Sequence, residues 1–280
     1  MVGGLAAYAF LEPYRFRVGR VTIPAPVDAP RLTILHVSDP HMRKTNRRLK
    51  RFLDDLPEAL GETPDLVLAT GDLLDDDSGI DPVVEALNRL DARLGRFYVL
   101  GSHDYFQAEK PSYFKYWGKD GGTGLSKHAD VARLEGGLAA KGWVSLSNRE
   151  ETIDTAAGRI RLAGVDDPYL RWDDISHVRR QADDVYAIGL MHAPNLVSEF
   201  ALRGFDLMVA GHTHGGQVRI PGFGAVITNS LLPAALAMGA NAVGRSWLHV
   251  SPGLGNGPFT PIRFGCRPEA TLLRLEPEGS

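Results

Sequence analysis

The amino-acid sequence predicts an α/β protein, and two observations carry that prediction. Strand-like and helix-like stretches alternate through the first half of the chain, which is typical of βαβ units whose strands lie side by side in one sheet. The second half is richer in strand-like runs. The chain has 280 residues, of which 44% are apolar, and this is ample for a sizeable core. The sequence contains no internal repeat or linker, so we expect one domain.

Strands are expected where short apolar runs rich in β-forming residues are bounded by turn residues. In the first half these runs are Leu32–Val37, Leu66–Ala69 and Phe97–Leu100. In the second half they are Ile160–Val165, Val185–Met191, Leu207–Ala210, Trp247–Val250 and Thr271–Leu275. Stretches with helical spacing separate several of these runs, as βαβ units require.

Three helices are expected from apolar residues that recur on one helical face. The first places Leu49, Phe52, Leu53, Leu56 and Leu60 on that face. The second begins at Asp81, with Pro82 in its first turn, and ends at Gly95. Its buried stripe consists of Val84, Leu87, Leu90 and Leu94. The third covers roughly residues 195–203.

Residues 1–31 are expected to pack as an N-terminal segment on a domain formed by residues 32–280. Val2–Leu11 is apolar, but a helix that crosses a bilayer needs roughly 20 such residues. No basic leader or cleavage site is evident. We interpret Val2–Leu11 as a strand or docking segment, with a clipped or peripheral membrane anchor as the alternative. The expected location is the cytoplasm, and association with a membrane through this segment is the second option.

Charge and cysteine content exclude some classes of function. The formal net charge is -3, so the chain lacks the basic footprint with which proteins hold a nucleic-acid backbone, and nucleic acid is not expected as a partner. Cys266 is the single cysteine, which excludes an internal disulfide and a thiolate metal cluster. Any metal must therefore take oxygen and imidazole ligands.

Polar side chains follow the predicted strands at the points where the strands end. Parallel strands bring their carboxyl ends to one edge of a sheet, where ligand sites form in α/β proteins. We therefore expect these residues to converge, although Asp39, Asp72 or His192 taken alone is more typical of a turn or a buried hydrogen bond. The residues at the strand ends are Asp39, His41, Asp72, His103, His192, His212 and His214.

The spacing of these residues favours a metal site. In Asp39-Pro40-His41 and His212-Thr213-His214, residues two apart place both side chains on the same side of an extended segment. Imidazole and carboxylate ligands together suit transition metals better than calcium or a soft metal. Mn, Zn or Fe are the expected divalent ions, with Mg or Co as alternatives.

The ordered motifs of the chain resemble those of the calcineurin-like metallophosphoesterases. The motifs are Asp39-Pro-His41, Gly71-Asp72, Gly101-Ser-His103-Asp104, His192 and Gly211-His-Thr-His-Gly-Gly-Gln217. The Gly- and Pro-rich tail ending in Arg267-Pro268-Glu269 resembles a bacterial branch that includes wall- and lipid-directed phosphodiesterases. The resemblance implies a sandwich of two mixed β-sheets flanked by helices.

The resemblance also implies a role for each site residue. Asp39, His41 and His214 would hold the first metal, and Asp72 would bridge to the second. His192, His212 and Ser102 would hold the second metal. The family pattern has asparagine where this chain has Ser102. A neutral hydroxyl is a poorer donor to a dication than an amide oxygen, so the second site is expected to bind more weakly.

These roles predict an enzyme that hydrolyses a phosphomonoester or phosphodiester by metal-hydroxide attack at a dinuclear centre. His103 would protonate the leaving oxygen, and Asp104 would orient the ring of His103. The expected substrate is a small-molecule, nucleotide-like or lipid-linked phosphoester, and no protein partner is inferred. The alternative is a catalytically weak, metal-holding interaction module of the same fold, for which Ser102 is the first sign.

Several other residues are assigned from their surroundings in the sequence. His36 and His249 lie within apolar strands and are expected to be buried, hydrogen-bonded groups that support the metal ligands. The aromatic stretch Tyr105–Gly124 is expected either to form a wall of the substrate site or to cover a sheet edge. Arg263 is weighed as a phosphate contact, and Asp166 and Asp167 as turn residues.

Overall fold

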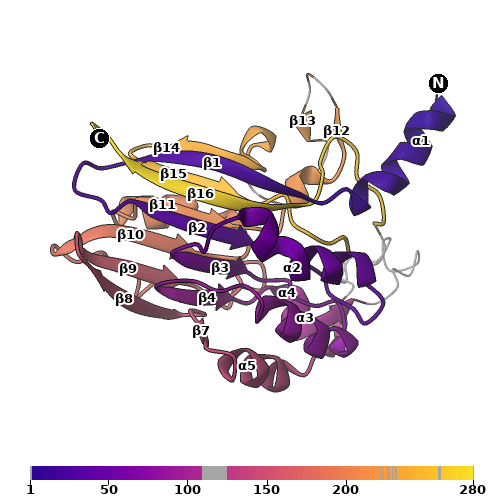
Figure 1. The fold of residues 1–280 in the computed structure, drawn as a ribbon, viewed down its shortest axis with the longest axis horizontal. Coiled ribbons are helices and arrows are strands. Elements are labelled where there is room, and N and C mark those ends of the chain that lie inside the picture. Colours follow the sequence, from indigo (N-terminus) through magenta and orange to yellow (C-terminus); the bar gives the residue numbers. More distant parts are fainter. Residues whose placement is uncertain are drawn as a thin grey trace.

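Two six-stranded sheets pack face to face, and helices cover the outer faces (Figure 1). A computed structural model describes residues 2–108, 125–220, 222, 224–225, 228, 230, 232–257 and 260–279. Most of the predicted aromatic stretch Tyr105–Gly124 therefore lies outside the described residues. Within the described residues, no helix is both long enough and apolar enough to cross a membrane.

The first sheet has the order β1-β16-β2-β3-β4-β7. Its strands are β1 (Arg17–Ala25), β16 (Glu269–Pro277), β2 (Leu32–Val37), β3 (Leu66–Thr70), β4 (Gly95–Val99) and β7 (Trp143–Ser145). Strands β2, β3, β4 and β7 run parallel, and β16 is antiparallel to β2. The parallel group places the carboxyl ends of β2, β3 and β4 at one edge.

The second sheet has the order β14-β15-β11-β10-β9-β8. Its strands are β14 (Gly239–Val243), β15 (Ser246–Val250), β11 (Leu207–Ala210), β10 (Asp184–Leu190), β9 (Gly158–Gly164) and β8 (Arg149–Thr155). The four central strands are parallel, and the two edge strands are antiparallel to their neighbours. Two small ribbons complete the strands: β5 (Phe106–Ala108) with β6 (Leu125–His128), and β12 (Arg219–Ile220) with β13 (Gly224–Ala225).

Side-chain alternation along the strands creates three apolar layers. Ile34 of β2 and Ile188 of β10 both belong to the core between the two sheets. Leu35, the next residue along β2, points outward and packs against the helices on the first sheet. Ala187 of β10 points to the other outer face, where it belongs to the cluster around Phe200. The predicted sandwich of two mixed sheets flanked by helices is confirmed.

The helices are α1 (Val2–Leu11), α2 (Arg47–Leu60), α3 (Ile80–Leu87), α4 (Ser102–Tyr105), α5 (Val131–Ala139) and α6 (Val197–Leu202). Helix α2 buries Leu49, Leu53, Leu56 and Leu60 on one face, as the spacing predicted. It ends at Gly61, whose φ of 72° is the left-handed conformation that glycine adopts without strain. Short 3-10 turns occur at Glu12–Tyr14, Asp77–Gly79, Pro194–Leu196, His214–Gly216 and Ala234–Leu236.

Two predicted elements differ from the structure. Val2–Leu11 is a helix, so the strand interpretation is wrong; its alanines and leucines are strong helix formers. Helix α3 ends at Leu87 and does not continue to Gly95. The amides of Arg93 and Leu94 instead donate to the carbonyls of Pro64 and Asp65, which draws this segment away from a helical path.

Candidate metal centre

The predicted ligands lie in the loops that follow five neighbouring strand ends. Five of them have positive φ angles, a region in which non-glycine residues are uncommon. The angles are 50° for Asp39, 44° for His41, 49° for Asp72, 66° for His212 and 49° for His214. Such backbone conformations cost about 1–3 kcal/mol each and cluster at functional sites. The backbone is therefore strained at the residues whose side chains point toward one another in the predicted site.

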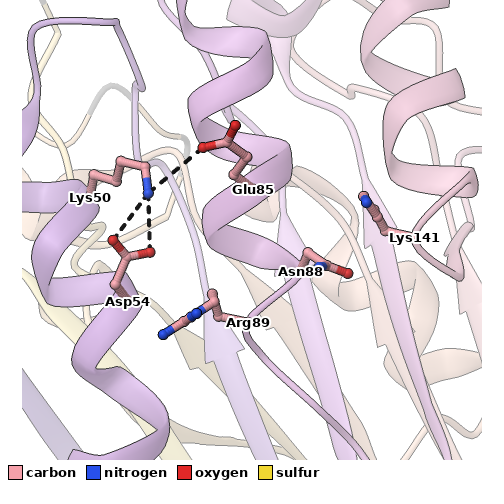
Figure 2. Close-up of a pocket in the computed structure, with 6 residues that line it drawn as sticks. All are labelled: Lys50, Asp54, Glu85, Asn88, Arg89 and Lys141. Carbon is pink, nitrogen blue, oxygen red and sulfur yellow. Dashed lines mark hydrogen bonds and ion pairs between the residues drawn. The ribbon is translucent and has the colours of Figure 1, made fainter.

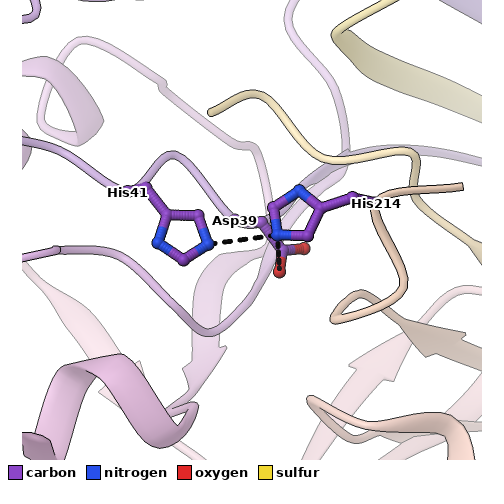
Figure 3. A group of neighbouring side chains, drawn as sticks. All are labelled: Asp39, His41 and His214. Carbon is purple, nitrogen blue, oxygen red and sulfur yellow. Dashed lines mark hydrogen bonds and ion pairs between the residues drawn. The ribbon is translucent and has the colours of Figure 1, made fainter. Parts of the chain in front are cut away.

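The first group of donor atoms belongs to Asp39, His41 and His214 (Figure 3). The Nε2 atoms of His41 and His214 lie 3.1 Å apart, and Asp39 Oδ1 lies 3.6 Å from His214 Nε2. Asp39 and His41 are buried. Three donor atoms thus converge from two different sheets, as one metal ion would require.

The second group belongs to Asp72, His192 and His212. Asp72 Oδ2 lies 3.4 Å from His192 Nε2, and His192 Nε2 lies 3.3 Å from His212 Nδ1. The same Asp72 Oδ2 lies 3.6 Å from His41 Nε2 of the first group. One carboxylate oxygen therefore stands between the two groups.

Ser102 is buried at the start of α4, beside these groups. The amide of its neighbour His103 donates to Asp72 Oδ1 at 2.9 Å, which holds the loop of Ser102 against the bridging carboxylate. Among the described residues, no hydrogen bond ties the Ser102 hydroxyl to the six Asp and His side chains. The role of Ser102 as a ligand stays a prediction.

Hydrogen bonds fix which imidazole nitrogen of two ligands faces the centre. His41 Nδ1 lies 2.7 Å from Asp75 Oδ1, and Arg43 pairs with the other oxygen of Asp75 at 2.6 Å. His192 Nδ1 lies 2.7 Å from the carbonyl oxygen of Thr70. Each Nδ1 therefore carries the proton and donates it, which leaves Nε2 free to bind metal. Asp75 was not among the predicted site residues; the signal for it in the sequence is an acidic residue three positions after Asp72.

A buried chain of hydrogen bonds leads from Asp39 into the core between the sheets. Ser38 Oγ donates to Asp39 Oδ2 at 2.5 Å, and Thr70 Oγ1 donates to Ser38 Oγ at 2.7 Å. Thr70 Oγ1 lies 2.9 Å from His36 Nε2. His36 Nδ1 then lies 2.8 Å from His249 Nδ1, across the interface of the two sheets.

The direction of this chain follows from the Asp39 carboxylate, which only accepts. Each hydroxyl has one proton, so Thr70 must accept from His36 Nε2–H, and His36 Nδ1 must accept from His249 Nδ1–H. Burial lowers the pKa of His36 well below its usual value and that of His249 to about 4, so both rings are neutral at pH 7. Every donor therefore points toward Asp39 and stabilises its negative charge. The supporting role predicted for His36 and His249 would consist of this chain of hydrogen bonds to Asp39.

We expect Thr70→Val to weaken the binding of the first metal about tenfold, because loss of outer hydrogen bonds to a ligand typically costs that much. Valine keeps the shape and the carbonyl that His192 uses, but it removes both the donor to Ser38 and the acceptor for His36. Titration calorimetry with Mn²⁺ measures the change. Thr70→Ser should restore binding, and Thr271→Val, which alters a buried threonine outside the chain of bonds, should leave it intact. Equal affinity in Thr70→Val would contradict the positioning role.

His103 and Asp104 occupy different environments from each other. The ring of His103 packs edge-on against His41 at 4.8 Å, and its Nδ1 is buried without a hydrogen-bond partner. Burial lowers the pKa of His103. Asp104 Oδ1 accepts from the amides of Leu73 and Leu74, and Oδ2 accepts from the amide of Gly101. The prediction that Asp104 orients the ring of His103 is therefore wrong: Asp104 holds together the two loops that carry Asp72 and His103.

Arg263 supports His214 and does not reach the surface. Its side chain is fully buried, and it donates to the carbonyls of Pro252, Gly255 and Cys266. Its Nη2 lies 3.3 Å from His214 Nδ1. The contact with phosphate considered for Arg263 is not supported, because an arginine enclosed by carbonyl groups cannot meet a ligand from solvent.

The electrostatics of the site fit divalent cations. Burial alone would lower the pKa of His41, but the carboxylates of Asp75, Asp72 and Asp39 outweigh it and raise that pKa to about 9. Burial likewise lowers the pKa of His192, but the carboxylate of Asp72 outweighs burial and raises that pKa well above its usual value. The buried carboxylates thus stabilise positive charge at the point where nitrogen and oxygen donors converge. Divalent cations would supply that charge, and these donors are ligands that they prefer.

A separate polar cavity of about 330 Å³ lies on the outer helical layer (Figure 2). Lys50 on its wall pairs with Asp54 at 3.0 Å and with Glu85 at 3.8 Å. The remaining lining residues are Asn88, Arg89 and Lys141. This cavity brings together none of the predicted ligands, and both of its carboxylates are already paired with Lys50, so we do not assign the chemistry to it.

Comparison with known proteins assigns the chain to a family. The family described as calcineurin-like phosphoesterase matches residues 32–216, and the chain belongs to this family. An uncharacterized metallophosphoesterase of Bacillus subtilis, YkoQ, is 28% identical over 88% of this chain and 84% of its own length. A second from the same organism, YkuE, is 27% identical over 98% of this chain and 90% of its own length. The phosphodiesterase YaeI of Escherichia coli is 25% identical over 81% and 76%.

Proposed function

We propose that the chain hydrolyses phosphoesters with two divalent cations. Asp39, His41 and His214 would hold the first, and His192, His212 and Ser102 would hold the second. Asp72 would contribute to both. The observation that carries the proposal is the position of Asp72 Oδ2, 3.6 Å from His41 Nε2 and 3.4 Å from His192 Nε2. A single oxygen between two imidazole groups is the arrangement expected of two ions that share a carboxylate.

Two bound cations would supply Lewis acidity that polarises a phosphoryl group and makes hydroxide available from water at neutral pH. The chain contributes fixed donor atoms on strained loops, so the ligands need little rearrangement when an ester binds. His103 holds the proton for the leaving oxygen at Nε2, because its Nδ1 is enclosed. No side chain of the centre acts as a nucleophile.

A phosphodiester is the substrate class with the most support. The Escherichia coli relative is named a phosphodiesterase, and the family as a whole is named for phosphoester hydrolysis. Imidazole and carboxylate donors favour Mn, Zn or Fe as the native ions. A cytoplasmic location and a small-molecule, nucleotide-like or lipid-linked substrate stay predictions.

The proposal is tested by removing the metals and restoring them one kind at a time. Chelated protein should hydrolyse neither bis(p-nitrophenyl) phosphate nor p-nitrophenyl phosphate. Addition of Mn²⁺, Zn²⁺ or Fe²⁺ should restore turnover of at least one ester and bring metal content to two per chain. Metal binding without turnover of either ester would favour the alternative, a metal-holding interaction module. Turnover that persists after chelation would overturn the role of metals.

A further inference from the structure

The N-terminal segment exposes large apolar side chains beside the metal centre. Phe10 is 57% exposed, Leu11 59% and Tyr14 53%. Helix α1 contains no charged residue, and it projects from the body of the sandwich (Figure 1). Burial of such side chains is favourable wherever an apolar phase is at hand. A cluster of this kind is therefore a candidate for contact with an apolar partner.

A basic stretch lies next to these apolar residues. Six of the nine residues from 43 to 51 are lysine or arginine, although the whole chain has a net charge of -3. Lys44, Arg47, Arg48 and Arg51 are exposed, and no carboxylate of the described residues pairs with them. Arg47 and Arg48 occupy the first turn of α2, where the helix dipole disfavours cations. The fold therefore maintains an unpaired positive charge at this place against its local cost.

Direct contacts join the apolar and basic parts into one surface. The guanidinium of Arg48 lies over the ring of Tyr14, 4.8 Å from its centroid. The rings of Phe16 and Phe52 stack at 5.0 Å, which fixes the N-terminal segment against α2. We name this surface, formed by Phe10, Leu11, Tyr14, Lys44, Arg47 and Arg48, the basic apolar face.

We propose that the basic apolar face binds a lipid bilayer that carries anionic headgroups. Apolar side chains that enter the boundary of the acyl chains, flanked by arginine and lysine at the headgroups, are the two signals that hold proteins at such surfaces. Charge complementarity favours an anionic surface. The exposed Phe10 and Leu11 distinguish a bilayer from a nucleic acid, since a polyanion offers no apolar phase to aliphatic side chains.

The basic apolar face is coupled to the metal centre through short contacts. The amide of Arg263 donates to the carbonyl of Ala9 at 3.0 Å, and the side chain of Arg263 touches His214. On the other side, Arg43 pairs with Asp75, which holds His41. Docking through α1 therefore places the metal ligands close to the bilayer surface. If the proposed function holds, the substrate class is a phosphoester carried on a membrane lipid.

The proposal is tested by co-sedimentation of the full chain with vesicles. One set contains phosphatidylcholine alone, and the other about three parts phosphatidylcholine to one part phosphatidylglycerol. The chain should bind the anionic vesicles. Arg47→Gln combined with Arg48→Gln should weaken that binding by about fivefold for each arginine. Phe10→Ser combined with Leu11→Ser should weaken it by about tenfold or more.

Val27→Ser serves as the matched control, because Val27 is 71% exposed and belongs to the loop between β1 and β2. That loop lies at the end of the sandwich opposite α1 (Figure 1). Binding of Val27→Ser should equal that of the unaltered chain. Failure of the chain to bind anionic vesicles, or binding unchanged by the Phe10 and Leu11 substitutions, would overturn the proposal. Tight binding to duplex DNA that these substitutions leave unchanged would identify a polyanion site instead.

The proposed function is measured separately on the same variants. The Phe10 and Leu11 substitutions should leave turnover of a soluble chromogenic phosphodiester unchanged, since neither residue belongs to the metal centre. Loss of vesicle binding with intact turnover supports docking as an independent property. Vesicle binding by a chain with no hydrolytic activity would refute the proposed function and leave docking in place.

Discussion

Asp72→Asn is expected to abolish dinuclear metal binding and to lower phosphoester turnover by about four orders of magnitude or more. Asp72 Oδ2 stands between the two donor groups, 3.6 Å from His41 Nε2 and 3.4 Å from His192 Nε2. An amide in its place brings no negative charge to balance two dications. Asparagine keeps an oxygen that can accept from the amide of His103, as Asp72 Oδ1 does at 2.9 Å, so the loop should retain its path.

The measurement is metal content per chain beside turnover of a chromogenic diester. Asp76→Asn provides the control, because it removes a carboxylate from the same loop and asparagine still caps the turn at Asp77–Gly79. The control should keep its metals and its activity. If Asp72→Asn retained two ions per chain, the bridging role of Asp72 would be wrong.

The candidate ligands could be predicted from the sequence because each follows a strand that is itself easy to recognise. Strands β2, β3, β10 and β11 are short apolar runs, and Asp39, Asp72, His192 and His212 each stand two residues beyond the end of one of these strands. Once parallel pairing is assumed, such residues must meet at one edge. The structure brings these four residues together. Parallel pairing of the strands could be assumed from the alternation of strands and helices alone, without knowledge of long-range contacts.

Other parts of the site depend on contacts that no local pattern encodes. His249 meets His36 although 213 residues separate them, because the two sheets pack face to face. Asp104 follows His103 directly, yet its oxygens accept from the amides of Leu73 and Leu74, 31 and 30 residues away, as well as from Gly101. Proximity in sequence suggested a partnership with His103 that the geometry of α4 does not allow.

The same limit applies to the elements of the fold. Strand β1 escaped prediction because its partner β16 begins at Glu269, at the far end of the chain. Strand β8 has mostly exposed residues at the edge of its sheet, so it shows no apolar alternation. Edge strands of this kind are specified by their neighbours more than by their own residues.

His103→Ala is expected to lower turnover of alkyl phosphoesters by about 10²–10⁴-fold, the usual contribution of a general acid. The ring lies 4.8 Å from His41, and its Nδ1 has no hydrogen-bond partner, so no structural bond of the side chain is lost. A p-nitrophenyl ester, whose leaving group departs without a proton, should lose less than about tenfold. Comparison of the two esters therefore isolates proton transfer from general damage to the site.

Metal content decides between two roles for the same ring. The donor atoms of His41, Asp72 and His103 lie within 4.8 Å of one another, so His103 is close enough to belong to the ligand set. As a proton donor, His103 is dispensable for metal binding, and His103→Ala should keep its full complement of ions while it discriminates between the esters. If His103 is a ligand, His103→Ala should lose metal and should lose activity toward both esters. If His103→Ala lost turnover of both esters equally and also lost an ion, His103 would be a metal ligand and not the proton donor to the leaving group.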